Sequence, residues 1–153
     1  VLKAAKRSGY AAKQGAISCY IHDGRIGTMV ELNCETDFVA KTDEFKQLLN
    51  HLCLHIAATE QVYYLNEEEI PESVIEREKE IARESMADSG KQPEILEKII
   101  EGKIAKWKKT VCLLSQPFYE EDKKTVQDVI TEMGAKSGEN ISCARFAKFV
   151  LGE

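Results

Sequence analysis

The sequence is poor in proline, tryptophan and histidine, and it has no excess of positive charge. It holds three prolines, one tryptophan and three histidines among 153 residues. Few prolines together with 43% hydrophobic and 31% charged residues are typical of a globular protein and argue against a fibrous or disordered chain. The net charge of −5 argues against nucleic acid as the main partner, because surfaces that bind phosphate are usually basic.

Paired cysteines and long apolar runs are also missing. The five cysteines are odd in number and show none of the spacings of zinc or redox sites, which indicates a reducing compartment. No apolar run approaches the roughly 20 residues of a membrane span, and no signal peptide is visible. We therefore expect a soluble intracellular protein that has no membrane partner and needs no cofactor.

The region from residue 15 to residue 33 predicts two strands joined by a tight turn. Apolar and polar residues alternate on both sides of the segment from His22 to Arg25. Its Asp23-Gly24 pair favours the positive φ angles that a two-residue hairpin turn needs. We expect an antiparallel β-hairpin here.

Three helices are predicted in the middle of the chain. Apolar residues spaced three and four apart indicate a helix over residues 43 to 58, with Thr42 as its N-cap. A second helix starts near Pro71 and stops at Ser89-Gly90, and a third starts at Pro93. The short link between the last two predicts an antiparallel helical hairpin over residues 68 to 108.

The last third of the chain predicts a strand, a helix and a strand. The apolar run at residues 110 to 116 reads as a strand, and Thr125 with Asp128 has the form of a capping box that opens a helix. Residues 140 to 151 suggest a final strand. The order predicts an α+β fold whose partly antiparallel sheet, formed by the N-terminal hairpin and two later strands, packs with helices.

Few residues suggest enzymatic chemistry. His51 and His55 are four apart on one helix and could present two imidazoles to a metal, but no marked further ligand accompanies them. The competing interpretation is a pair of histidines at the edge of the core. Cys34 is a conceivable thiol nucleophile, but a buried, inert cysteine at a strand end is the favoured interpretation.

The segment from Asn33 to Ala40 is the unusual one, because Phe38 is an aromatic residue in an otherwise polar and small connection. The local interpretation is a helix cap. Thr36 or Asp37 would accept backbone hydrogen bonds, and Phe38 would pack inward as a hydrophobic staple.

The same region closely resembles the signature of elongation factor Ts. Residues 24 to 41 read GRIGTMVELNCETDFVAK, and a match of this length is far stronger than a short motif. Further stretches resemble the family in the same order: His51 to Ala58, Ser89-Gly90-Lys91, Glu101-Gly102-Lys103, Gln116-Pro117-Phe118, Gly138 to Ile141, and Arg145-Phe146.

The resemblance implies a protein that binds elongation factor Tu and promotes GDP release, interacting with its GDP-bound and nucleotide-free forms. In the family the loop corresponding to Thr36, Asp37, Phe38 and Val39 is the exchange element. Phe38 would enter an apolar pocket between helices of elongation factor Tu and indirectly loosen its magnesium and phosphate site, and His55 would support that contact. Such a protein acts by binding, without covalent catalysis.

The resemblance also implies an organisation. We expect residues 1 to 153 to be a single core domain with residues 68 to 108 as a projecting helical hairpin, and the family's N-terminal UBA-like helical domain to be absent. Short members of the family form homodimers through the sheet, which we expect here, in a bacterial cytoplasm or an organelle of bacterial ancestry. The alternatives are a partner-binding module of the same fold without exchange activity, or a metal- or thiol-dependent enzyme using His51, His55 or Cys34.

Overall fold

The computed structural model describes residues 11–153, and the chain divides into two compact units. The described part of the first unit comprises residues 11–60 and Pro117–Glu153. The second unit is the continuous segment Gln61–Gln116. The second unit is therefore inserted into the sequence of the first.

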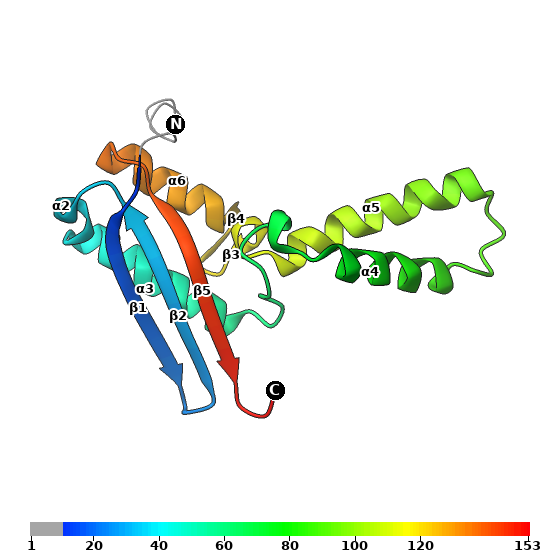
Figure 1. Ribbon diagram of the computed structural model, residues 1–153, viewed down its shortest axis with the longest axis horizontal. Helices are drawn as coiled ribbons and strands as arrows, with labels where there is room; N and C mark the ends of the chain where they lie inside the picture. Colours follow the sequence, from blue (N-terminus) through cyan, green and yellow to red (C-terminus); the bar gives the residue numbers. More distant parts are fainter. Residues whose placement is uncertain (1–10) are drawn as a thin grey trace. The chain divides into compact units, whose positions relative to one another are not determined.

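The first unit contains a three-stranded antiparallel sheet (Figure 1). The order is β1 (Gln14–His22), β2 (Ile26–Cys34), β5 (Ser142–Val150), so β2 lies in the middle. Asp23 and Gly24 take φ angles of 51° and 66° in the turn between β1 and β2. These positive angles suit the twist of an antiparallel pair, and the predicted hairpin is confirmed.

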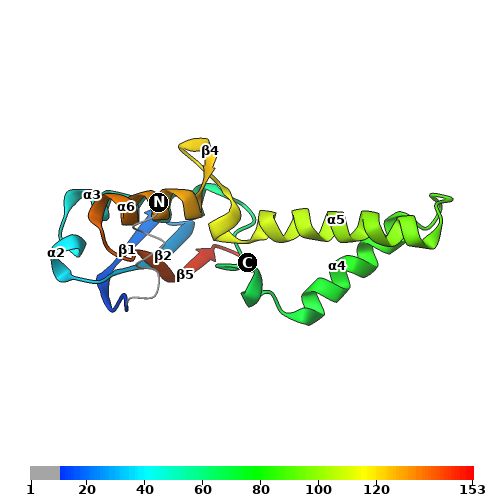
Figure 2. The same cartoon turned by 90° about the horizontal axis from the view of Figure 1, so that it is seen from above.

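Two helices cover one face of this sheet, α3 (Asp43–Ala58) and α6 (Val126–Ser137) (Figure 2). Their apolar stripes meet the alternate side chains of β2 that point toward the helices. The side chains buried in this layer include Val30, Leu32, Phe45, Leu49, Leu52, Ile56, Val126 and Ile130. The core of the first unit thus lies between a sheet and two helices, and the opposite sheet face is left outside it.

Both helices begin where the sequence predicted. The Thr42 hydroxyl accepts a hydrogen bond from the N–H of Phe45 at 3.3 Å and caps α3. Thr125 and Asp128 form the predicted capping box of α6, with reciprocal bonds of 3.1 and 2.9 Å. Each cap satisfies backbone donors that the first turn of a helix leaves without an intrahelical partner.

The second unit is a helical hairpin of α4 (Glu72–Ser85) and α5 (Pro93–Val111), which run antiparallel (Figure 1). A short 3₁₀ helix stands on each side of the pair, η1 (Glu67–Glu69) and η2 (Leu113–Ser115). The unit has its own buried cluster of Ile70, Ile75, Ala82, Ile100, Ile104, Val111 and Cys112. The two predicted helices are confirmed.

The strand predicted at residues 110 to 116 is wrong. The helix α5 continues to Val111 and is followed by η2, with a single isolated bridge between Tyr64 and Cys112. A short apolar run is as typical of a buried helix end as of a strand, so the pattern alone could not separate them.

The final strand was correctly expected, whereas the small sheet of β3 (Pro117–Phe118) and β4 (Glu121–Thr125) was not. The α+β class with a partly antiparallel sheet is confirmed.

Candidate partner-binding site

A short helical turn, α2 (Asp37–Ala40), follows the end of β2 and carries the most exposed phenylalanine of the described chain. Thr36 is its N-cap, and the Thr36 hydroxyl accepts a hydrogen bond from the N–H of Val39 at 3.4 Å. The side chain of Phe38 is 80% exposed. The predicted cap at Thr36 is therefore confirmed, but the predicted inward packing of Phe38 is wrong.

The turn is closed at its far end as well. The Thr42 hydroxyl donates to the carbonyl of Val39 at 2.7 Å while also capping α3, so one side chain joins the two helices. Lys41 and Asp37 form an exposed ion pair at 3.4 Å, which contributes little because solvent screens it. The helix α2 ends at Ala40, and α3 begins at Asp43.

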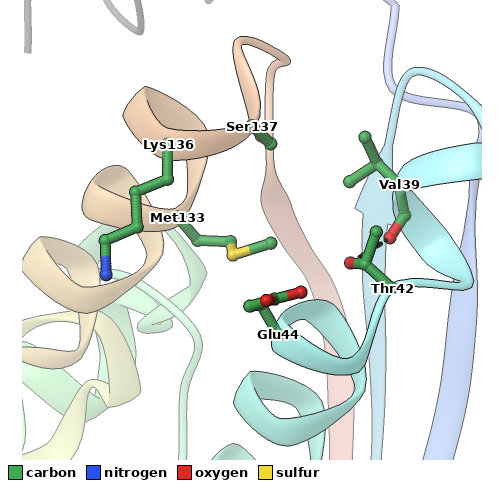
Figure 3. A pocket seen from close by; sticks show the side chains of 6 residues that line it. All are labelled: Val39, Thr42, Glu44, Met133, Lys136 and Ser137. Carbon is green, nitrogen blue, oxygen red and sulfur yellow. Dashed lines mark hydrogen bonds between the residues drawn. The ribbon is translucent and has the colours of Figure 1, made fainter.

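A groove lies beside this turn, with a cavity volume of about 400 Å³ (Figure 3). It is lined by Val39, Thr42, Glu44, Met133, Lys136 and Ser137. The Met133 side chain extends across the groove from α6 toward the start of α3, as Figure 3 shows. Val39, which lines this groove, directly follows Phe38 in the chain, so the groove adjoins the exposed turn.

The turn is also tied to a distant segment that the sequence reasoning overlooked. The Glu139 carboxylate, which lies between α6 and β5, accepts hydrogen bonds from the backbone N–H groups of Glu35 and Thr36. The Thr36 hydroxyl donates to its other oxygen at 2.6 Å. No local pattern marks Glu139, and the only signal was its place in a stretch that resembles the family.

Cys34 ends β2 directly before this turn and is fully buried. Its thiol donates to the carbonyl of Thr36 at 3.0 Å. Burial, together with the nearby charge of Glu139, raises the pKa of the Cys34 thiol above its ordinary value. The predicted burial of Cys34 is confirmed, and a raised pKa lowers the thiolate fraction, which favours an unreactive thiol over a nucleophile.

The two candidate histidines contact the β3 segment. His55 is 1% exposed, its ring stacks on Phe118 at a centroid distance of 6.0 Å, and its Nδ1 accepts the N–H of Tyr119 at 3.2 Å. His51 Nδ1 lies 2.8 Å from the hydroxyl of Tyr119 and 3.2 Å from the carboxylate of Glu120. The histidines therefore hold the chain after β3 in place.

The structure does not bring His55 close to the exposed turn. His55 lies twelve residues beyond Asp43 in α3, which corresponds to about 18 Å of helix rise. Within residues 11–153, no three or more histidine, cysteine, aspartate or glutamate side chains gather as a metal site would need. Any support that His55 provides to a partner contact would pass through the residues of β3 that it holds.

A second exposed surface lies on the sheet face that α3 and α6 leave uncovered. Ile17, Ile21, Met29 and Phe149 are all exposed there, and Phe149 is 75% exposed. Phe149 is paired with Gly27 near the β1–β2 turn, whereas Phe38 follows the other end of β2. The first unit thus has two separate apolar features on its surface.

The protein is therefore an α+β protein of two compact units, with an aromatic side chain exposed on a capped turn. Comparison with known proteins identifies the family. The family model described as "Elongation factor TS" matches residues 2–153. This chain belongs to the elongation factor Ts family, whose members are translation elongation factors.

Bacterial relatives agree with this assignment. The chain is 49% identical over 151 residues to elongation factor Ts of Carboxydothermus hydrogenoformans, covering 98% of this chain and 69% of the relative. It is 49% identical over 152 residues to the proteins of the same name from Syntrophomonas wolfei and Fervidobacterium nodosum, covering 99% of this chain and 71% and 77% of those proteins. Among the described residues, no helix is both long enough and apolar enough to span a membrane.

Proposed function

We propose that this protein binds elongation factor Tu and accelerates release of GDP, acting through the turn of Thr36, Asp37, Phe38 and Val39. The observation that carries the proposal is the 80% exposure of Phe38 on a turn capped at both ends. A large aromatic side chain held in solvent is unfavourable for the isolated protein and becomes favourable when a partner buries it. Aromatic anchors of this kind supply most of the binding energy at many interfaces.

Exchange follows from binding if the protein prefers one state of its partner. A protein that binds nucleotide-free elongation factor Tu more tightly than the GDP-bound form weakens GDP binding by the same factor, because the coupling is reciprocal. Phe38 would enter an apolar pocket of the partner, and the charge of Asp37 beside it would orient the contact. No group of this chain has to transfer a proton or form a covalent bond in this scheme.

His55 has an indirect place in the proposal. Because its Nδ1 accepts the N–H of Tyr119, that nitrogen carries no proton, and the neutral ring packs flat against Phe118. Its burial argues that it supports the partner contact by fixing β3 and the residues after it. Replacing it would act on the shape of this segment.

The test is the rate of GDP release from elongation factor Tu loaded with a fluorescent GDP analogue, measured as a function of added protein. We expect the parent chain to accelerate release and Phe38→Ala to lower kcat/KM roughly thirtyfold, which corresponds to loss of a hot-spot side chain. Tyr63→Ala is the control, because it removes another exposed aromatic ring, which belongs to the second unit and is not part of the turn or the sheet face. It should retain the parental rate per chain.

Three outcomes would count against the proposal. An inactive parent with an intact fold overturns it, and equal losses in both variants show that the turn is not the contact. Tight binding of elongation factor Tu without faster GDP release would identify a partner-binding module of the same fold that lacks exchange activity.

We also propose that two copies associate through the uncovered sheet face in the bacterial cytoplasm. Ile17, Ile21, Met29 and Phe149 line this face, and Glu31 pairs with Arg145 on it at 2.9 Å. A contiguous apolar surface with a polar element is typical of a protein interface. A two-fold arrangement would let each copy cover the same residues of the other.

A further inference from the structure

The carboxylate of Glu139 is hydrogen-bonded to the residues that enter the exposed turn. One oxygen accepts the backbone N–H groups of Glu35 at 3.1 Å and of Thr36 at 3.0 Å. The other oxygen accepts the Thr36 hydroxyl at 2.6 Å. Hydrogen bonds to an ionised acceptor are stronger than neutral ones, so this group holds three donors at the start of α2.

A second hydrogen bond joins the same two segments in the opposite direction. The backbone N–H of Asn140 donates to the side chain of Glu35 at 2.8 Å, so each segment supplies a carboxylate to the backbone of the other. Glu139 follows Gly138, which ends α6 with a φ of 72°, and α6 belongs to the helical layer over the sheet. The turn is therefore anchored to the packed layer of the unit through a residue 103 positions away in sequence.

The turn needs such an anchor because it is too short to hold itself. A helix of four residues, the length of α2, does not repay the conformational entropy of its own nucleation. The Thr36 hydroxyl caps α2 by accepting from Val39 and donates its proton to Glu139, so the cap and the anchor share one atom. Without the Glu139 carboxylate, the Thr36 hydroxyl loses the acceptor that orients it as a cap.

We propose that Glu139 is a positioning residue for the partner contact, which fixes the turn so that Phe38 is presented in its binding geometry. The proposal rests on the exchange function argued above and deepens it. A preformed turn avoids the entropy cost of ordering the anchor side chain at the moment of binding. Glu139 itself need not touch the partner.

Two variants of Glu139 should weaken the positioning of the turn to different degrees. Glu139→Ala removes all three acceptor contacts, whereas Glu139→Gln keeps the shape and one acceptor oxygen but replaces the other with a donor. The matched control is Asp128→Ala, which removes a carboxylate that accepts the N–H of Thr125 at 2.9 Å at the opposite end of α6. It weakens the same unit without touching the turn.

The first readout is hydrogen exchange of individual backbone amides, followed by NMR. We expect the amides of Glu35 and Thr36 to exchange slowly in the parent and in Asp128→Ala. They should exchange at least tenfold faster in Glu139→Ala, because their acceptor is gone. A purely global destabilisation would instead speed exchange in the control variant to the same degree.

The second readout is GDP release from elongation factor Tu. We expect Glu139→Ala to lower kcat/KM roughly tenfold and Glu139→Gln to lower it less, while Asp128→Ala keeps the parental value. The concentration of Glu139→Ala needed for half-maximal acceleration should rise, because the turn of this variant adopts its binding geometry for only part of the time.

A double-mutant cycle with Phe38→Ala decides whether Glu139 acts through the ring. If it does, adding Glu139→Ala to Phe38→Ala costs nothing further. Additive losses, or parental activity in a Glu139→Ala variant whose Glu35 and Thr36 amides are unprotected, would overturn the positioning role while leaving the exchange function intact. An inactive parent would instead overturn the exchange function, and the inference with it.

Discussion

At the scale of single residues, the surroundings of a side chain decide what it can do, and the cysteines show this clearly. Cys19 is exposed on β1, whereas Cys34, Cys53, Cys112 and Cys143 are buried. Burial disfavours the thiolate, and it raises the pKa of Cys34, Cys53 and Cys112. These three residues behave as small apolar side chains, whereas Cys19 is exposed in the single chain.

Cys112 carries the largest of these effects and a testable pH dependence. Burial, and secondarily the charges of Glu67, Glu69 and Glu68, raise the pKa of its thiol from 9.0 to about 11. Because the folded pKa lies above the unfolded one, the folded state holds the proton more tightly. The contribution of this group to stability is therefore complete below pH 9.0 and is lost as the pH rises through about 11.

We expect the stability difference between the parent and Cys112→Ala to shrink as the pH is raised from about 8 to about 10.5, because only the parent has this thiol to ionise. The measurement is urea denaturation at both pH values. Val111→Ala is the control and should show the same stability difference at both pH values, because it shortens a buried neighbour of Cys112 without removing an ionisable group. A constant difference for Cys112→Ala would contradict the expectation.

At the scale of the elements, β1 depends on a glycine at its second position. Gly15 has a φ of 146°, and a Cβ placed on it would lie 2.1 Å from the carbonyl oxygen of Leu32. Gly15 pairs with Asn33 in the ladder, so this close approach belongs to the pairing of β1 with β2. The conformation and the space both exclude a side chain here.

Gly15→Ala should therefore destabilise the protein by about 2 kcal/mol or more, since the strand must shift or leave its backbone conformation. The measurement is the free energy of unfolding in urea. Gly102→Ala is the matched control: it lies in the interior of α5, where a Cβ meets nothing within 4 Å, and should stabilise by up to about 1 kcal/mol. Equal stability of parent and Gly15→Ala would show that the start of β1 is more adaptable than its geometry indicates.

At the scale of the whole molecule, the proposed association of two copies through the uncovered sheet face can be tested by the oligomeric state. We expect the parent to sediment at twice its chain mass of 17.2 kDa at micromolar concentration. Phe149→Glu should make it monomeric, because a charge placed in an apolar interface is left without a partner. The measurement is sedimentation velocity over a range of concentrations.

Tyr63→Glu serves as the control for this experiment. Tyr63 is also exposed, but it belongs to the second unit and is not part of the sheet face. It should leave the dimer unchanged. A parent that stays monomeric at all concentrations, or a Phe149→Glu variant that stays dimeric, would contradict association through this face.

What the sequence by itself determined about this protein is mainly local. Asp23-Gly24 predicted the hairpin turn, Thr42 predicted the start of α3, and Thr125 with Asp128 predicted the cap of α6, because each depends on backbone groups a few residues away. The family also followed from the sequence, because the signature at residues 24 to 41 is long and continuous.

The tertiary structure alone decided how distant segments meet. The pairing of β5 with β2, the contact of Glu139 with Thr36 and the placement of His55 on Phe118 join residues more than 60 positions apart, and no local pattern encodes them. The outward position of Phe38 belongs here too, because the cap at Thr36 fixes where the turn begins but not which way the ring faces. The local capping pattern alone predicted a buried ring, whereas the family resemblance implied an exposed one, and the structure places the ring in solvent.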